Sequence, residues 1–319
     1  DALLENKPIV FLLNPPYAAG TNFAKDGTGK AGVSNSTTKN IMLKNGIAGS
    51  ASQNLYTQFL YRILLLKNKF NLTNTYISVF CPTLFLSGAS FKSFRNSFLN
   101  SFEYINAIQF NAGHFNNVSA SWGVSFSIWK CGETINKTDF LYKCVDVENN
   151  KIIVNNLKYV YNADKHLSGS KWSKQQNTNK IDFPIFTSGI SIVSNSTKTN
   201  LFFENSIGTM YNGGNNVDTN IVNCALFTGA YNDGSHNVPI YGNLDFYKIV
   251  CFFAARKLIE KNWINSKDEY LAPNESHPKF QEFVNDSIVF SLFNGASNQS
   301  SLRNVNYHDK LWDIKNEFF

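Results

Sequence analysis

A continuous apolar run closed by two prolines constrains the fold of this chain more than any other feature. Ile9–Leu13 contains no polar residue, and Asn14-Pro15-Pro16-Tyr17 follows it directly. Short apolar runs without alternation are typical of strands buried on both faces of a parallel sheet. Proline has no amide proton and fixes φ, so the strand ends where the prolines begin. We therefore predict an α/β sheet in which a loop follows the carboxyl end of this strand.

The sequence after this strand alternates between loop-like and periodic segments. Residues 18 to 54 are rich in Gly, Ala, Ser, Thr, Asn and Lys, and we interpret them as a mobile loop. Apolar residues then recur at helical spacing or alternate with polar ones. The predicted elements are a helix over 52–68, a strand over 76–81, a helix over 91–102, a strand over 107–110 and a strand over 122–128.

The length of 319 residues predicts about two domains. Residues 1–130 are predicted to form the α/β sheet, which ends in an antiparallel hairpin. The texture changes in 131–245, where short apolar runs are separated by clusters of Asn, Gly, Ser and Lys, and this indicates a mixed α+β region. Helical spacing returns after Phe246, so 246–319 is predicted to be a helical tail.

The composition of the chain indicates which kinds of binding partner and which cellular compartment to expect. Lys and Arg total 29 against 23 Asp and Glu, a formal charge of +6 that favours polyanionic partners such as nucleic acids. The five cysteines are scattered and odd in number, which predicts neither a disulfide framework nor a zinc site, and no metal site is expected. No apolar run reaches the roughly 18 residues of a membrane span. We predict a protein without membrane contact, located in the cytoplasm.

The proline motif has a specific chemical use. Two successive prolines stiffen the backbone, so that the Asn14 amide oxygen and the Pro15 carbonyl point at one small group beyond the strand. An exocyclic amine fits, because these oxygens would accept its two hydrogens and localise the nitrogen lone pair for attack on a methyl group. Tyr17 would offer a ring face on which a base stacks. The alternative interpretation is that the prolines only end a strand.

These residues resemble the amino-methylating methyltransferases, in particular the N6-adenine DNA methyltransferases of restriction-modification systems. The resemblance covers about residues 1 to 130 and implies a partial Rossmann-like methyltransferase sheet followed by a target-recognition region. The matching features are Asn14-Pro15-Pro16-Tyr17, Leu55-Tyr56 with Phe59, the strand 76–81 ending at Pro82, Phe94-Arg95, and Phe126-Ser127-Ile128-Trp129; Ala254-Ala255-Arg256-Lys257, Trp263 and Phe318-Phe319 match the family's C-terminal region loosely.

The resemblance also implies a cofactor, a substrate and roles for three residues. Asn14, Pro15 and Tyr17 would hold an adenine flipped out of double-stranded DNA, and the 18–54 loop would close over it. The methyl donor would be S-adenosylmethionine. The glycine-rich turn and acidic residue that bind this cofactor in the family have no convincing counterpart here. We therefore expect the cofactor-binding half to lie upstream in the same protein or in a partner subunit, and the chain alone to be inactive.

A basic stretch offers candidate DNA contacts. Lys165, Lys171, Lys174 and Lys180 surround Trp172, a combination that could follow phosphates and stack on a base. A solvated protein face is the competing interpretation. Two other functions stay open: a protein-glutamine or RNA methyltransferase, because amide and base amines can use the same acceptors, and a DNA-binding specificity module that keeps the motif without turnover.

Overall fold

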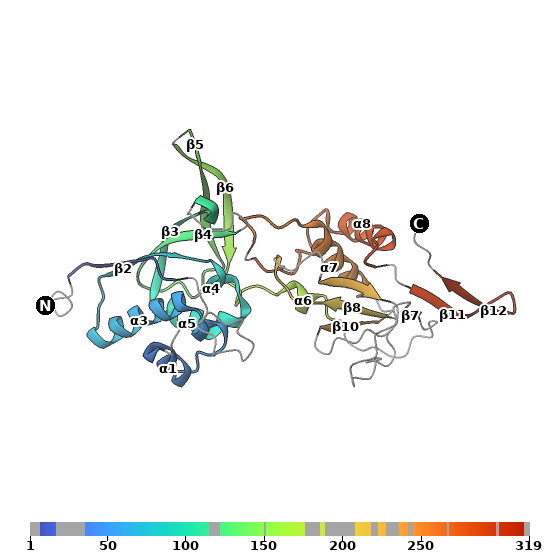
Figure 1. The fold of residues 1–319 in the computed structure, drawn as a ribbon, viewed down its shortest axis with the longest axis horizontal. Helices are drawn as coiled ribbons and strands as arrows, with labels where there is room; N and C mark the ends of the chain where they lie inside the picture. The colour runs from blue at the N-terminus through green and yellow to red at the C-terminus, as the bar shows by residue number, and fades with distance from the viewer. Residues whose placement is uncertain are drawn as a thin grey trace. The chain divides into compact units, whose positions relative to one another are not determined.

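The chain divides into two compact units in the computed structural model (Figure 1). Unit 1 comprises Asp1–His166 with Asn262–Asp268, and unit 2 comprises Leu167–Lys261 with Glu269–Phe319. The structure describes residues 7–16, 36–114, 122–149, 151–175, 186–188, 208–217, 223–227, 236–241, 245–266, 268–297 and 300–315.

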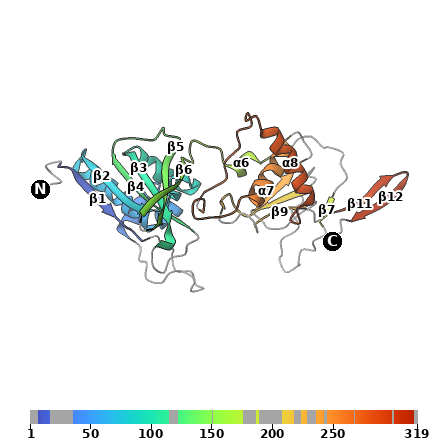
Figure 2. The same cartoon turned by 90° about the horizontal axis from the view of Figure 1, so that it is seen from above.

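Unit 1 is built on a six-stranded mixed sheet, whose strands lie side by side in Figure 2. β1 is parallel to β2, and β4 runs antiparallel to both of its neighbours, β2 and β3. β5 is parallel to β3 and forms an antiparallel hairpin with β6. In spatial order the strands are β1 (Ile9–Leu13), β2 (Thr75–Cys81), β4 (Gly123–Cys131), β3 (Phe102–Asn111), β5 (Asp139–Glu148) and β6 (Lys151–Tyr161).

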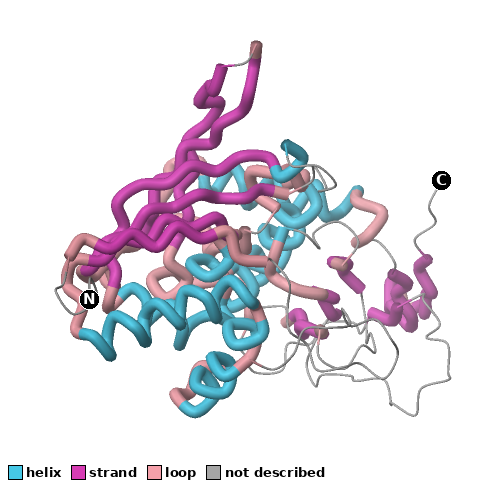
Figure 3. Tube along the Cα trace, turned by 60° about the vertical axis from the view of Figure 1, so that its left-hand side comes forward, coloured by secondary structure: helices cyan, strands magenta, loops and turns pink. Residues whose placement is uncertain are grey.

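Helices cover the face of this sheet that carries Ile77, Val79 and Cys81 (Figure 3). These three β2 side chains are fully buried, and they alternate with half-buried residues on the opposite face. The predicted helix over 52–68 and strand over 76–81 are therefore present. The helices are α1 (Thr37–Lys44), α2 (Ser50–Gln53), α3 (Leu55–Phe70), α4 (Leu84–Ser87) and α5 (Lys92–Leu99), with 3-10 turns at Ala89–Phe91 and Ala112–His114.

The first strand forms as predicted, but it is not buried on both faces. Val10 is 62% exposed and Leu12 is 69% exposed, whereas Phe11 and Leu13 pack against the core. β1 lies at the edge of the sheet, and the described helices pack on the face opposite Val10 and Leu12. The apolar run thus corresponds to a strand with two apolar faces. Within the described residues, one of these faces is covered.

The predicted mobile loop is wrong for its second half. Residues 36 to 54 contain α1 and α2, and Met42, Ile47 and Ala51 are buried in the unit 1 core. Ser36 caps α1 by accepting a hydrogen bond from the Lys39 amide at 3.0 Å. A few well-spaced apolar residues are enough to hold short helices once α3 supplies a surface for them. Residues 17–35 lie outside the described part of the chain.

The sheet does not end at residue 130, so that predicted boundary is wrong. β4 is inserted between β2 and β3 rather than closing the sheet, and β3 also pairs with β5 through Ile108 to Phe110. Phe140, Tyr142 and Cys144 of β5 are fully buried and continue the core. The compact unit therefore extends to His166. Figure 1 shows the β5–β6 hairpin reaching beyond the other strands.

Unit 2 combines helices with two three-stranded sheets, ordered β10-β8-β9 and β12-β11-β7. Its core contains Ile249, Phe252 and Phe253 of α7. The mixed α+β texture predicted for 131–245 thus applies to the part of that region beyond residue 166. The elements are α6 (Gly169–Trp172), β7 (Phe186–Ser188), β8 (Gly208–Asn212), β9 (Cys224–Phe227), β10 (Asn237–Ile240), α7 (Phe246–Leu258), α8 (Phe280–Phe293), β11 (Ser300–Tyr307) and β12 (Lys310–Lys315).

The predicted helical tail is correct for α7 and α8 but wrong after residue 300. β11 and β12 form a hairpin in which Tyr307 pairs with Lys310. The two residues between them, His308 and Asp309, have φ of 51° and 56°. A two-residue turn with positive φ at both positions matches the right-handed twist of paired strands. No helix in the described residues has the length and hydropathy that a membrane span requires.

Candidate functional site

The proline motif lies where several strand ends of unit 1 meet. β1, β2 and β3 end at one edge of the sheet, and β4 begins there, as the register of the strand pairs requires. Open α/β sheets bind their ligands outside the carboxyl ends of parallel strands. We therefore treat this carboxyl edge as the candidate site.

Asn14 and Pro16 are exposed at this edge, whereas Pro15 is buried. The side chain of residue 14 is thus not packed into the protein interior, which its proposed role as an acceptor requires. Tyr17 lies outside the described residues. The roles of Asn14, Pro15 and Tyr17 stay predictions.

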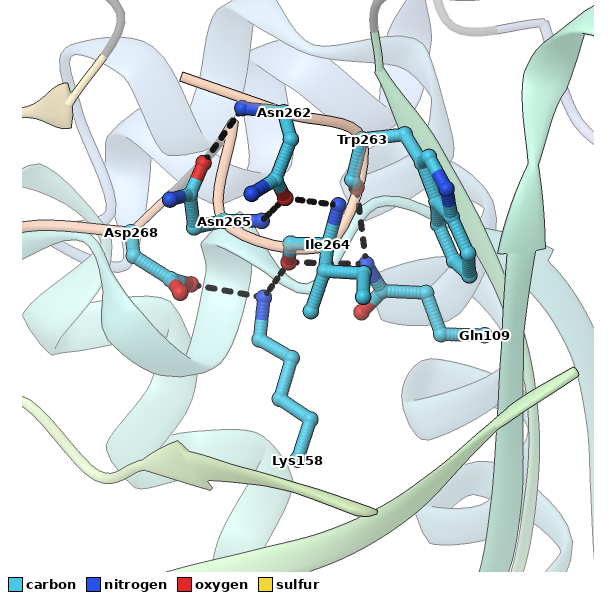
Figure 4. A network of polar contacts seen from close by, with 7 residues as sticks. All are labelled: Gln109, Lys158, Asn262, Trp263, Ile264, Asn265 and Asp268. Carbon is cyan, nitrogen blue, oxygen red and sulfur yellow. Dashed lines mark hydrogen bonds and ion pairs between the residues drawn. The ribbon is translucent and has the colours of Figure 1, made fainter. Parts of the chain in front are cut away.

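A second feature of the carboxyl edge comes from far along the chain (Figure 4). Residues 262–266, which we call the strap, dock against β3 and β6. The Gln109 side-chain nitrogen donates to the carbonyl oxygens of Trp263 at 3.1 Å and Ile264 at 3.0 Å. The Lys158 ammonium donates to the same Ile264 carbonyl. Two side chains from different strands therefore hold the backbone of the strap.

The strap is also closed on itself. The Asn262 side-chain oxygen accepts from the amides of Ile264 at 2.9 Å and Asn265 at 3.2 Å, and the Asn262 amide donates to the Asn265 side chain at 2.8 Å. Asp268 follows and pairs with Lys158 at 2.8 Å. Burial raises the pKa of the Asp268 carboxyl, and the nearby Lys158 charge opposes that shift.

The strap has no counterpart among the elements predicted from the sequence. Trp263 is there only part of a loosely matching tail, and Gln109 and Lys158 have no predicted role. A local signal was present in Lys158, a charged residue in an otherwise apolar strand end, and in the Asn262 and Asn265 pair, whose side chains favour turns. Neither signal identifies the partner, because Gln109 and Trp263 are 154 residues apart.

In the predicted DNA-contact stretch, the aromatic residue is buried and not presented on the surface. Trp172 is only 7% exposed, and its indole N–H donates to Glu275 at 2.7 Å. Its ring packs beside Tyr247 and Phe280, so Trp172 is a core residue of unit 2 and not a stacking platform. Lys165 belongs to unit 1, exposed Lys171 and Lys174 belong to unit 2, and Lys180 lies outside the described residues.

Glu275 gives unit 2 a testable pH dependence. Hydrogen bonds from Trp172 and Tyr247 lower the pKa of the Glu275 carboxyl. The Tyr247 hydroxyl donates to Glu275 at 2.7 Å, and this hydrogen bond is the main reason that the pKa of Tyr247 is raised to about 12. A carboxyl with a lowered folded-state pKa stabilises the fold above its unfolded pKa, and this contribution is lost as pH falls through the folded value.

We expect Glu275→Gln to flatten the acid side of the stability profile of unit 2, because the amide still accepts hydrogen bonds but does not titrate. The stability of unit 2 is measured by thermal unfolding, monitored through amide hydrogen exchange in α7, at pH values from neutral down to those at which carboxyl groups titrate. Trp172→Phe removes one donor and should flatten the profile partly. An unchanged acid slope in Glu275→Gln would show that this carboxylate does not couple to folding.

The tail residues that match the family loosely have a structural role. Arg256 is fully buried, and its guanidinium donates to the Asn212 side chain and the Gly214 carbonyl. It also lies 5.9 Å from the Phe252 ring centroid and 5.8 Å from that of Tyr270. Burial lowers the pKa of Arg256, and the surrounding acceptors and rings compensate the buried charge. Arg256 therefore joins α7 to the β8 end of unit 2.

A hollow of about 460 Å³ lies away from the proline motif. Its lining includes Leu72 before β2, Ser101 before β3 and Gly132 after β4, which places it at the opposite edge of the unit 1 sheet. No group of three or more His, Cys, Asp or Glu side chains in the described residues is arranged to hold a metal ion.

Comparisons with known proteins give weak structural likenesses. No protein-family model and no curated protein matches the sequence. The chain is similar to a modification subunit of a putative type I restriction enzyme from Vibrio vulnificus YJ016, with 15% identity, a TM-score of 0.28, and coverage of 46% of this chain and 27% of that one.

Two further solved structures belong to restriction-modification proteins. A chain of a type I restriction-modification system has 18% identity and a TM-score of 0.25, with 47% of this chain and 26% of that chain covered. The type IIL restriction-modification enzyme MmeI in complex with DNA has 12% identity and a TM-score of 0.36, with 80% and 32% covered. The matched region thus spans about a quarter to a third of each of these chains.

Proposed function

We propose that this chain is the catalytic-end portion of an S-adenosylmethionine-dependent N6-adenine DNA methyltransferase of a restriction-modification system. The observation that carries the proposal is the position of Asn14-Pro15 directly after β1, with the Asn14 side chain exposed at the carboxyl edge of the sheet. Double-stranded DNA is the proposed substrate, and the net charge of +6 is consistent with a polyanion.

The chain's own residues would act on the target amine. An exocyclic amine conjugated with a ring is a poor nucleophile, because its lone pair is delocalised. The Asn14 side-chain oxygen and the Pro15 carbonyl would accept its two hydrogens, which favours a pyramidal nitrogen with a localised lone pair. Tyr17 would hold the plane of the base by stacking. Fixed acceptors of this kind supply orientation without a general base.

The described residues do not fit the cofactor. Within the loops that follow β1 and β2 at the carboxyl edge, the described residues 14–16 and 82–83 include neither a glycine-rich turn nor an acidic residue. S-adenosylmethionine would supply the methyl group when bound elsewhere. We propose that its binding half is upstream in the same protein or in a partner subunit.

Within the described residues of unit 1, the helices pack on one face of the sheet, and the face that carries Val10 and Leu12 supports a further layer. Val10 and Leu12 are more than 60% exposed there, and the half-buried Phe80 and Phe126 rings lie 4.6 Å apart on the same face. A sheet face that carries apolar side chains is normally packed against another layer. The cofactor-binding half would cover these apolar side chains.

The test is methyl transfer from labelled S-adenosylmethionine to duplex DNA by the chain joined to its upstream region or mixed with the partner subunit. We expect transfer to adenine N6, and we expect Asn14→Ala to reduce it by at least about 100-fold, the scale for removing one preorganised hydrogen-bonding group. Asn136→Ala is the matched control, since Asn136 is exposed in unit 1 away from the carboxyl edge.

The outcomes separate the alternatives. DNA binding without transfer would favour a specificity module, and transfer to RNA or to a glutamine-containing peptide would favour the second enzymatic interpretation. Full activity in Asn14→Ala, with the fold intact by circular dichroism, would contradict the role of this residue.

A further inference from the structure

The strap lies at the same height of the unit 1 sheet as the proline motif. Gln109 pairs with Ser125, and Ser125 pairs with Cys81. Cys81 is two residues beyond Val79, the partner of Leu13, so the same register brings Pro15 level with Gln109. Three strand intervals of about 4.8 Å separate them, which is about 14 Å.

Two buried side chains hold the strap against the sheet. Gln109 is 3% exposed and Lys158 is 7% exposed, and the side-chain nitrogen of each donates to a strap carbonyl. Burying a polar donor is unfavourable unless it is paired, so the Gln109 nitrogen and the Lys158 ammonium each depend on the strap carbonyls that they contact. Gly123 also permits it, because a Cβ at that position would lie 2.5 Å from the Trp263 carbonyl oxygen.

The side chain that this docking positions is Trp263, which is half-buried. In Figure 4 its ring projects from the strap on the side away from Asp268. An aromatic ring on a rigid support can stack on any base, because every base has a π-face. Bases along one strand rise about 3.4 Å each, so the separation of about 14 Å between Pro15 and Gln109 corresponds to about four base rises. A ring on the strap that Gln109 holds would therefore meet a different nucleotide of the DNA from the target.

We propose that Trp263 is a base-stacking residue that contacts a nucleotide a few positions from the target, and that Gln109 and Lys158 are positioning residues that hold it at the carboxyl edge. This inference rests on the proposed function, because it takes DNA as the substrate. The strap would fix the register of the DNA relative to Asn14.

The first experiment measures the binding of the full chain to a fluorescein-labelled single-stranded oligodeoxynucleotide and to its duplex, by anisotropy at low ionic strength. We expect Trp263→Ala to weaken single-strand binding by about 5- to 100-fold, the range that corresponds to the stacking of one base. Trp263→Phe should recover most of the affinity. Trp312→Ala is the matched control, since Trp312 is 50% exposed on the β11–β12 hairpin. We expect this variant to bind the oligonucleotide as the wild type does.

The second experiment tests the positioning residues. Gln109→Leu removes the donor to both strap carbonyls, and we expect it to weaken binding in the same direction as Trp263→Ala. The double variant should bind no more weakly than Trp263→Ala alone, because both changes remove one interaction. A purely structural role for Gln109 would instead give additive losses. If Gln109→Leu does not fold, Gly123→Ala replaces it in this test, because the added Cβ displaces the strap by steric contact.

The failures are distinguishable. If the wild type binds DNA and Trp263→Ala binds equally well, the strap proposal is overturned and the proposed function stands. If the wild type binds neither oligonucleotide, the DNA substrate itself is wrong, and the strap proposal falls with it.

Discussion

Replacing Asp164 with alanine is expected to destabilise unit 1 by about 3 kcal/mol. Arg95 is fully buried in α5, and Asp164 holds it by two bonds, from Nε at 3.0 Å and from Nη2 at 2.8 Å. Removing the carboxylate leaves a buried guanidinium whose remaining acceptors are the carbonyls of Phe85 at 3.3 Å and Gly88 at 2.8 Å. Loss of one partner from a buried ion pair costs about 3–5 kcal/mol, and the 18% exposure of Asp164 places this case at the lower end.

Urea unfolding of the full chain, followed by hydrogen exchange of β3 and β4 amides, reports on unit 1 separately. Glu103→Gln is the control. It breaks an ion pair to Lys130 of similar length, 3.0 Å, but both side chains are 43% exposed, so we expect less than about 1 kcal/mol. Equal effects of the two substitutions would mean that burial does not set the strength of the Arg95 pair.

The second large effect is expected from Trp129→Ala, which should cost unit 1 about 3–5 kcal/mol or prevent its folding. Trp129 on β4 is fully buried and its indole N–H donates to Ser127 at 2.9 Å. Its ring is surrounded by aromatic rings from four other elements, so truncation leaves a large cavity. The ring centroids lie at 5.1 Å for Phe98, 5.2 Å for Tyr104, 5.8 Å for Phe140 and 6.1 Å for Phe85.

The same exchange experiment measures this loss, and Phe59→Ala provides a comparison within unit 1. Phe59 lies on α3 and is 45% exposed, so its truncation removes less buried area and leaves no enclosed cavity. We expect a loss below about 1.5 kcal/mol. A small effect of Trp129→Ala, comparable to that of Phe59→Ala, would show that the aromatic cluster can collapse around the missing ring.

Local patterns predicted some elements of unit 1 well and others poorly. The four- and three-residue spacing of apolar residues gave α3, and the alternation from Trp122 to Ile128 gave β4. The same reasoning missed α1, because a short helix with few apolar residues depends on α3 to cover Met42. It also missed that Trp172 is buried, because aromatic and lysine residues in sequence do not reveal which side faces the core.

By itself, the sequence determined where β1 stops and which oxygens follow it, since a proline acts on its own backbone whatever surrounds it. It also determined the helical face of α3, because that periodicity is local. Only the tertiary structure decided that β4 enters between β2 and β3, and that Gln109 and Lys158 meet the strap. Pairings between distant residues, such as Ile77 with Trp129 or Gln109 with Trp263, depend on how strands and loops come together, and they leave no local pattern in the sequence.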